Sequence, residues 1–288
     1  MKTEKINGLL ANILIYLIAF VVGFIPFYFI KNILLASFVL TVTATMVVYL
    51  FSLCFKNTSI YDPYWSVAPL VILLMIYFRH SFWNVNSIII LSIVAIWSLR
   101  LTINWAITYK GLNPKYEDWR YAQFRQEQKP IVFHMINFFG LQFIPTLVVF
   151  AAMVPVILLS HQTVFNYWSI IGYAIALSGP ILEFIADHQV HKFIKQTNDH
   201  SLVCNIGLWK YSRHPNYLGE NLFWFGLFVA FVVTYPSLFY YGLGWICMPL
   251  LFICISIPMM EKHNIERRPA YLEYMKQTSM FFILPRRK

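Results

Sequence analysis

Charged residues are scarce in this chain of 288 residues: Asp, Glu, Lys and Arg together make up only 12% of it. Soluble domains usually carry about 25%, so the shortage excludes an ordinary soluble protein. Hydrophobic residues make up 59% instead. They gather in blocks of roughly twenty, the length that an α-helix needs to cross a bilayer. The sequence therefore predicts an all-α, polytopic integral membrane helix bundle.

The sequence signatures of disulfide, zinc and Rossmann proteins are also missing. The four cysteines show neither CxxC nor zinc-finger spacing, so neither a disulfide framework nor a redox pair is indicated. The chain has no GxGxxG sequence and no βαβ pattern, which excludes a Rossmann dinucleotide site. A bound nucleotide would therefore have to lie within the helix bundle.

The apolar blocks predict about eight transmembrane helices, arranged as a single membrane domain over residues 1–288. The first block follows Lys2 and Lys5, as a signal peptide would. Its apolar core is too long for one, and no A-x-A site follows, so we expect the helix to be retained. The predicted spans are residues 9–30, 33–55, 65–78, 86–108, 136–159, 166–186, 217–234 and 238–259.

The distribution of charge orients these spans. With the N-terminus in the cytoplasm, every Lys and Arg except Lys31 and Arg79 falls on the cytoplasmic side, as do all twelve acidic residues. The positive-inside rule favours such a bias, so we expect both termini and the active site to face the cytoplasm, in a bacterial inner membrane or the endoplasmic reticulum. The net charge of +10 would attract anionic membrane lipids. Because the basic residues are scattered among separate loops, we expect no nucleic-acid partner.

Several ionisable side chains lie inside or at the edge of the spans. Arg100 is midway along the fourth span, and Glu183 and Asp187 share one face of the sixth helix as it leaves the membrane. Charges in a bilayer are costly and usually face a bundle interior or a wet cavity. With the cations Lys192 and Arg213 nearby, they predict a shared polar pocket. The simpler alternative is that they snorkel to the interface or cap helices.

Residues 211–220, YSRHPNYLGE, hold the densest polar chemistry, directly before forty positions without a charged residue. The simpler interpretation is a loop entering a helix, with Asn216 as N-cap after Pro215. The alternative is a cofactor site, because a helix N-terminus and an Arg fork both suit phosphate and aromatic rings stack on a flat ring. Besides Ser212, six side chains of this segment can form hydrogen bonds and are candidates for the site: Tyr211, Arg213, His214, Asn216, Tyr217 and Glu220.

A metal site is not predicted. His188 and His191 are spaced i, i+3 and follow Asp187, so they could ligate a metal ion. A third well-placed ligand is missing, and a polar helix end explains the same residues.

Several segments resemble the DUF1295 family, which is related to the steroid 5α-reductases through their C-terminal domain and to the sterol C14 and Δ7 reductases. They are GLWKYSRHPNYLGE, EFIADHQVHKF, IERRPAYLEYMKQTSMFFILP, DPYWS at 62–66, RLTINW at 100–105 and EDWRY at 117–121. The resemblance covers about residues 60–285, with the cofactor-binding part in 183–285. RHPxYxG alone also resembles the isoprenylcysteine carboxyl methyltransferases, and the combination of segments is more specific.

The resemblance implies a membrane-embedded, NADPH-dependent reductase of an activated C=C bond in a lipid, which would be steroid-like, isoprenoid or acyl. The lipid would enter from the bilayer and the cofactor would lie in a cytoplasm-facing cavity. Asn216 and Glu220 fall where relatives hold the cofactor, and Lys192 and Arg213 are expected to meet its phosphates. The remaining expected neighbours are Glu183, Asp187, Tyr211, His214, Tyr217, Arg268, Tyr271 and Tyr274.

Asp62 and Arg100 are the predicted catalytic residues, because charge that develops in a dry site needs a fixed polar partner. Asp62 falls near the position of a catalytic Glu in the 5α-reductases. Those enzymes also use a Tyr three residues before an Arg, and here Trp97 takes that place. Trp cannot donate a proton in the same way, so the 3-oxo-steroid substrate is in doubt and the proton donor is open. Tyr61, Tyr64 and Tyr109 are candidates to replace it.

Two other functions stay open. An S-adenosylmethionine-dependent membrane methyltransferase would share RHPxYxG, but its usual EE pair is reduced to the single Glu261 and Glu266. A non-enzymatic lipid-binding membrane protein would not need so many ionisable groups on one side of the membrane. The sequence leaves the lipid, the choice between NADPH and NADH, and the oligomeric state open.

Overall fold

The structure is a computed structural model of the chain, and it describes residues 2–161, 163–197, 199 and 201–286. Within these residues the fold is helical, and the β pairing is limited to one isolated bridge between Ser212 and Ser279. The all-α prediction is confirmed. The chain divides into two compact units, Met1–Phe165 and Asn166–Lys288. The single domain expected from the sequence would combine both units, and it stays a prediction.

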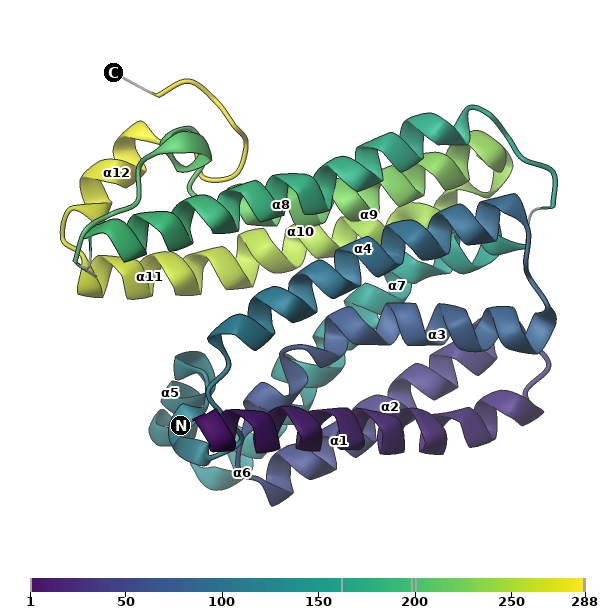
Figure 1. Cartoon of the computed structure of the whole chain (residues 1–288), viewed down its shortest axis with the longest axis horizontal. Coiled ribbons are helices and arrows are strands. Elements are labelled where there is room, and N and C mark those ends of the chain that lie inside the picture. Colours follow the sequence, from purple (N-terminus) through teal and green to yellow (C-terminus); the bar gives the residue numbers. More distant parts are fainter. Residues whose placement is uncertain (1, 162, 198, 200, 287–288) are drawn as a thin grey trace. The chain divides into compact units, whose positions relative to one another are not determined.

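Eight helices are long and apolar enough to cross a membrane, which confirms the predicted number and makes the chain an integral membrane protein (Figure 1). Their bounds differ from the predicted ones mainly at the polar ends, where the third begins earlier, at Thr58, and the eighth continues to Arg267. The spans are Thr3–Phe29, Ile33–Cys54, Thr58–His80, Val85–Thr108, Pro130–Ser160, Ser169–Thr197, Pro215–Thr234 and Pro236–Arg267. The cytoplasmic placement of the termini stays a prediction.

Two of the spanning helices of unit 1, Ile33–Cys54 and Val85–Thr108, are preceded by an asparagine whose side chain caps the helix. Asn32 accepts from Leu35 N–H, and Asn84 forms a reciprocal capping box with Ser87, which satisfies N–H groups that the first helical turn leaves unpaired. Its elements are α1 (Lys2–Phe29), α2 (Ile33–Cys54), η1 (Thr58–Tyr61), α3 (Tyr64–His80), α4 (Val85–Thr108), η2 (Pro114–Tyr116), α5 (Trp119–Glu127), α6 (Pro130–Met135), the π-helical η3 (Ile136–Phe143) and α7 (Ile144–Ser160).

The core of unit 1 includes hydroxyl groups that bond to one another inside the apolar spans. Tyr61 and Thr146 are 2.8 Å apart through their oxygens, and the Thr45 hydroxyl lies 3.3 Å from those of both Tyr64 and Thr146. All four residues are buried. Since an unpaired hydroxyl in hydrocarbon costs free energy, these pairs explain how the core tolerates them.

Unit 2 is dominated by two long antiparallel helices that pack through small residues. A Cβ added to Gly226 would strike the backbone of Ala176, and one added to Gly179 would come within 2.5 Å of the Gly219 carbonyl oxygen. Small residues allow such close backbone approach in membranes. The elements of unit 2 are α8 (Ser169–Thr197), η4 (Gly207–Lys210), α9 (Pro215–Thr234), η5 (Pro236–Ile246), α10 (Cys247–Leu251), the π-helical η6 (Phe252–Ser256), α11 (Ile257–Arg267) and α12 (Tyr271–Gln277).

Candidate functional site

Unit 2 contains a cavity of about 200 Å³ whose walls come from the end of α8, the segment 203–217, α11 and α12. Seven of the predicted cofactor-binding residues line it, so the structure brings together side chains that are up to 61 residues apart. These seven are Arg213, His214, Asn216, Tyr217, Arg268, Tyr271 and Tyr274.

The loop that forms one wall is fixed to α8 by local contacts. Gln189 on α8 accepts a hydrogen bond from Leu208 N–H at 2.8 Å, and the Trp209 indole donates to the Ala186 carbonyl at 2.9 Å. Gly207 has φ +55°, and a Cβ there would also collide with the Gln189 side chain. Glycine is therefore required at the turn that delivers Arg213 and His214 to the cavity.

Asn216 is not the N-cap that the simpler interpretation expected. Helix α9 begins at Pro215, His214 occupies the cap position, and no side chain caps the helix. Proline suits the first helical position because its missing N–H needs no partner there. The helix therefore starts two residues earlier than the N-cap interpretation requires, and Asn216 lies in its first turn and lines the cavity.

The Asn216 side-chain oxygen is buried and has no hydrogen-bond partner among the residues that the structure describes. Buried polar atoms nearly always have a partner, and leaving one unsatisfied costs about 1–3 kcal/mol. An unsatisfied acceptor at the wall of a cavity therefore indicates that a ligand with an N–H or O–H group belongs there.

Glu261 on α11 organises the cavity wall, and sequence reasoning did not include it in the site. Its Oε1 accepts from Arg213 Nε at 2.7 Å and lies 3.1 Å from His214 Nε2. All three side chains are buried. Its one indication in the sequence is that it is the first charged residue after the forty uncharged positions.

Arg213 is largely occupied by contacts within the protein. Besides Glu261, its Nη1 donates to the carbonyls of Met275 and Thr278 at 2.8 and 3.1 Å. These bonds connect the start of α9 to α11 and to the end of α12. Arg213 therefore contributes to the wall of the cavity, and the free guanidinium fork expected from the sequence is not available on those nitrogens.

Three planar rings stack beside this ion pair. His214 and Tyr217 are nearly parallel, with centroids 5.3 Å apart and an interplanar angle of 7°. Tyr217 in turn stacks on Phe252 at 4.5 Å and 13°. The stack fixes the orientation of the Tyr217 ring at the cavity wall.

The remaining wall combines one cation with neutral donors. Arg268 donates to Asn264 Oδ1 at 2.5 Å, and Tyr274 donates to the Trp209 carbonyl. Burial raises the pKa of both the Tyr271 and Tyr274 phenols, so both stay protonated. The Tyr274 O–H is committed to the Trp209 carbonyl, which leaves the Tyr271 O–H to donate to a ligand. This set can receive a polar or anionic ligand.

Five predicted cofactor residues lie elsewhere in unit 2. Glu183 and Glu220 are buried on the facing helices α8 and α9, where the Glu220 carboxylate accepts from the Trp224 indole at 2.8 Å. Lys192 and Tyr211 are exposed, and Asp187 is half-buried. In the described part of the chain none of these five lines the cavity.

The predicted catalytic residues belong to unit 1. The Tyr121 hydroxyl donates to Asp62 Oδ1 at 2.6 Å, so DPYWS and EDWRY meet in the fold. Burial and the Asp62 carboxylate raise the pKa of Tyr121. Its ring also faces the Arg120 guanidinium at 5.3 Å. Sequence reasoning missed Tyr121, although it had noted the segment that contains it.

Arg100 is half-buried on α4, one turn after Trp97. Trp97 is fully buried and packs edge-to-face against Trp65, with centroids 5.9 Å apart. The residue at the expected position of a catalytic Tyr is therefore a core residue in this chain.

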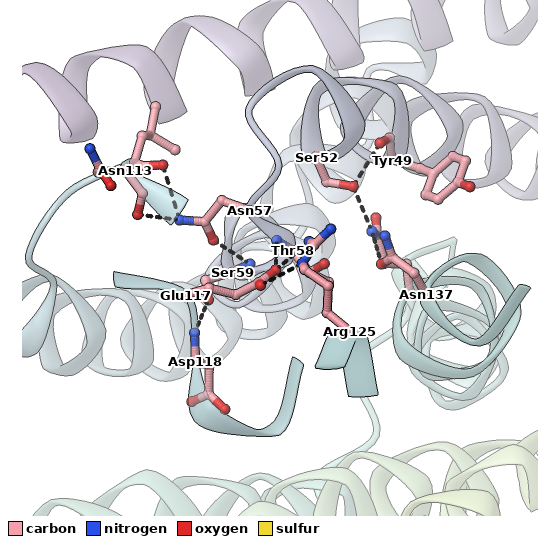
Figure 2. Close-up of polar contacts among 12 residues, drawn as sticks. Tyr49, Ser52, Asn57, Thr58, Ser59, Asn113, Glu117, Asp118, Arg125 and Asn137 are labelled. Atoms are coloured by element: carbon pink, nitrogen blue, oxygen red, sulfur yellow. Dashed lines mark hydrogen bonds and ion pairs between the residues drawn. The ribbon is translucent and has the colours of Figure 1, made fainter. Parts of the chain in front are cut away.

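A network of polar contacts holds the segment around Asp62 to the 109–130 connection (Figure 2). The Glu117 carboxylate accepts from Thr58 N–H at 2.8 Å and from two Arg125 nitrogens at 2.9 and 2.7 Å. The Asp118 N–H donates to the Ser59 hydroxyl, and the Asn57 amide donates to the Leu112 and Asn113 carbonyls. These contacts fix η1, which directly precedes Asp62, and α5, which contains Tyr121.

A second, more open hollow of about 430 Å³ lies in unit 1 between the start of α1 and residues 112–114. Its one charged wall residue, Glu4, bonds to Lys115 and Tyr116. Within the described ranges no predicted site residue lines it, so the cavity of unit 2 is the stronger candidate site.

Fold and site together define a polytopic helical membrane protein with a polar cavity in its C-terminal unit. The chain belongs to the DUF1295 family: the model of this family, described as a protein of unknown function, matches residues 48–278. The uncharacterized protein C594.04c of Schizosaccharomyces pombe is 24% identical in an alignment of length 287. The alignment covers 90% of this chain and 82% of that protein. No solved structure matches the chain significantly.

Proposed function

We propose that this protein is a membrane-embedded reductase that uses NADPH to saturate an activated C=C bond in a lipid. The observation that carries the proposal is the unpartnered Asn216 oxygen at the wall of the unit 2 cavity. NADPH carries amide and amino groups that can donate to such an acceptor, whereas the tail of a lipid carries none.

The remaining wall fits a charged, aromatic ligand. Arg268 provides a cation for a phosphate, and the Tyr271 phenol provides a neutral donor. The volume of about 200 Å³ is below the 300–1,000 Å³ of most ligand pockets, so we infer that it receives one end of the dinucleotide. When bound, NADPH would supply the hydride.

In unit 1, the part-buried Asp62–Tyr121 pair is the candidate for moving a proton. Its short hydrogen bond holds the phenol in one orientation, and the neighbouring Arg120 supplies a positive charge. The lipid that would accept the hydride is expected to enter from the bilayer. Asp62→Asn should leave NADPH affinity unchanged and reduce lipid-dependent NADPH oxidation at least about a hundredfold, which is the lower end of the range for general acid–base catalysis, about 10²–10⁴.

The first test is a thermal-shift comparison of NADPH, NADH and S-adenosylmethionine on the detergent-purified protein. NADPH should raise the melting temperature, and Asn216→Ala should weaken its binding about fivefold or more, the value of one hydrogen bond near 1 kcal/mol. Lys192→Ala is the matched control, because Lys192 is exposed outside the cavity. A shift with S-adenosylmethionine alone would instead identify a methyltransferase. No shift with any of the three would favour a non-enzymatic lipid-binding protein.

A further inference from the structure

The segment that follows α12 presents consecutive apolar side chains to the outside of unit 2. Phe282, Ile283 and Leu284 are 63%, 40% and 49% exposed. Tyr211, which is 39% exposed, lies beside them, because its carbonyl accepts a hydrogen bond from Leu284 N–H at 3.2 Å. Contiguous exposed apolar surface of this kind marks a contact with a membrane or a partner.

The segment is held in place by the rest of unit 2. The Ser212 hydroxyl donates to the Phe281 carbonyl at 2.7 Å, and Arg213 N–H donates to the Ser279 carbonyl at 2.8 Å. Phe281 is buried and Arg286 donates to Gln277 at 2.7 Å. The exposed apolar side chains of residues 282–284 are therefore held in fixed positions on the surface of unit 2.

Basic residues border this apolar surface. Lys210 lies over the Tyr211 ring at 5.8 Å, and Arg286 follows Leu284 by two positions. In Figure 1 the segment lies at the same end of unit 2 as α12 and the end of α11. Apolar side chains flanked by Lys and Arg are the composition of segments that lie in the interface of an anionic membrane.

The opposite end of unit 2 has a different composition. Tyr167 and Trp168, just before α8, are 78% and 69% exposed, and Tyr240 in η5 is 52% exposed. Residues 234–246 contain no charged residue. Exposed Tyr and Trp without charge are typical of a membrane–water interface. The two ends of α8 and α9 therefore carry two kinds of interfacial surface, and a bilayer between them would meet the 282–284 surface on its basic side.

We propose that Tyr211 and residues 282–284 form an interfacial anchor that inserts into the leaflet on the basic side of the membrane, with Lys210 and Arg286 on anionic head groups. The occupant is the bilayer itself. The charge complementarity argues for lipid, since a soluble partner or a second copy would need an acidic surface. The anchor does not depend on which ligand the cavity of unit 2 takes.

The experiment places a fluorescent NBD label on a single cysteine at position 283 (Ile283→Cys) or, as matched control, at position 273 (Glu273→Cys) on the exposed face of α12. The background replaces Cys54, Cys204, Cys247 and Cys254 with Ser. Nanodiscs contain phosphatidylcholine alone or with phosphatidylglycerol, and a second series includes a doxyl-labelled lipid that quenches NBD near the acyl chains.

We expect blue-shifted emission and doxyl quenching at 283, both stronger with phosphatidylglycerol, and neither at 273. Equal solvent exposure of the two labels would overturn the anchor. A blue shift at 283 without doxyl quenching would also overturn it, because protein would then cover the site. If the cysteine-free background does not fold, hydrogen exchange of residues 279–286 in the natural chain decides instead. Slower exchange with phosphatidylglycerol supports the anchor, and equal exchange in both discs contradicts it.

Discussion

Units 1 and 2 use their buried polar residues differently. In unit 1, Glu117 is bonded to Arg125 and to a backbone N–H, and Asp62 is bonded to Tyr121. In unit 2, a comparable ion pair between Arg213 and Glu261 forms the wall of a cavity that also contains an unpartnered acceptor on Asn216. A high density of buried polar residues is therefore not enough to identify a binding site. Both units contain buried polar atoms without a hydrogen-bond partner among the described residues, and what distinguishes unit 2 is that the Asn216 oxygen, one of these atoms, lies at the wall of a cavity.

The largest expected effect is a loss of stability in unit 2 when the close packing of α8 against α9 is disrupted. In Gly226→Leu the new side chain would meet the Ala176 backbone, so α8 and α9 must separate. We expect a loss of about 3 kcal/mol or more, the upper range for overpacking, seen as loss of monodisperse protein or a large fall in melting temperature.

Gly140→Leu is the matched control for this change. A Cβ at Gly140 meets nothing nearer than 3.8 Å, and Gly140 is exposed within η3. It should shift stability by no more than about 0.5 kcal/mol. Equal destabilisation by the two substitutions would mean that the α8–α9 contact is not the close one described.

The second effect breaks unit 1 at the network in Figure 2. Arg125→Ala leaves the buried Glu117 carboxylate without its cation, and the Arg125 side chain is itself one-third exposed. Removing one partner of a buried pair costs about 3–5 kcal/mol, and we expect about 2 after allowing for that exposure. Thermal melting in detergent measures it.

An exposed ion pair provides the control for Arg125→Ala. Lys276 and Glu273 on α12 are 74% and 61% exposed, so Lys276→Ala should cost less than about 1 kcal/mol. If Lys276→Ala were as destabilising as Arg125→Ala, the distinction between the buried network of unit 1 and surface pairs would be lost.

Much of the fold could be predicted from the sequence because membrane spans are local. An apolar block of about twenty residues is sufficient evidence for a spanning helix, and all eight blocks became helices. The start of the third span was missed, because Thr58 and Ser59 are polar. In the structure Thr58 N–H bonds to Glu117 and the Ser59 hydroxyl accepts from Asp118 N–H. Those partners are 59 residues away and cannot be inferred from a local pattern.

The site was predicted in its local part and missed in its distant part. Four residues of the segment 211–220 line the cavity as the density of polar residues suggested, but the partner of Arg213, Glu261, lies 48 residues away. The same holds for Tyr121 and Asp62, which are 59 apart. Hydropathy and spacing do not determine which helix faces which. The role of Asn216 was also ambiguous, because capping and ligand binding favour the same residue type.

The third prediction concerns the ion pair between Arg213 and Glu261 in unit 2, and it tests whether this pair supports ligand binding. Glu261→Gln keeps an acceptor near Arg213 and His214 but removes the charge, so the hydrogen bonds that orient these two side chains at the cavity wall are weakened. Hydrogen bonds to charged groups contribute about 1.5–3 kcal/mol, so NADPH affinity should fall about tenfold. Titration of NADPH fluorescence measures this.

Glu266→Gln, an exposed residue on the same helix, should leave both NADPH affinity and melting temperature unchanged. A Glu261→Gln variant that melts earlier yet binds NADPH with full affinity would contradict the role given to Glu261 at the cavity. It would leave the pair as a structural contact like that of Glu117 and Arg125.

The smallest effect concerns Cys204, a half-buried residue at the wall of the cavity. Burial raises the pKa of its thiol, and the Ile206 N–H and the Arg268 charge offset only part of that rise. The thiolate is the reactive form, so a raised pKa lowers the reactive fraction at any pH below it. In a variant that retains only Cys204, alkylation by iodoacetamide should therefore keep accelerating above pH 8.5, where an ordinary cysteine begins to level off. A rate that levels off below that pH would contradict the burial.

The alkylation rate of Cys204 can also report whether the cavity of unit 2 is occupied, with a cysteine of unit 1 as the reference. NADPH in the unit 2 cavity should slow alkylation of Cys204 several-fold, because the ligand would shield a residue that lines it. A variant that retains only Cys54, which is exposed at the end of α2 in unit 1, should react at the same rate with and without NADPH. Protection of both thiols would point to a change throughout the molecule. Protection of Cys204 alone, lost in Asn216→Ala, would assign the ligand to the cavity of unit 2, because shielding then depends on the acceptor that the described part of the chain leaves unsatisfied at its wall.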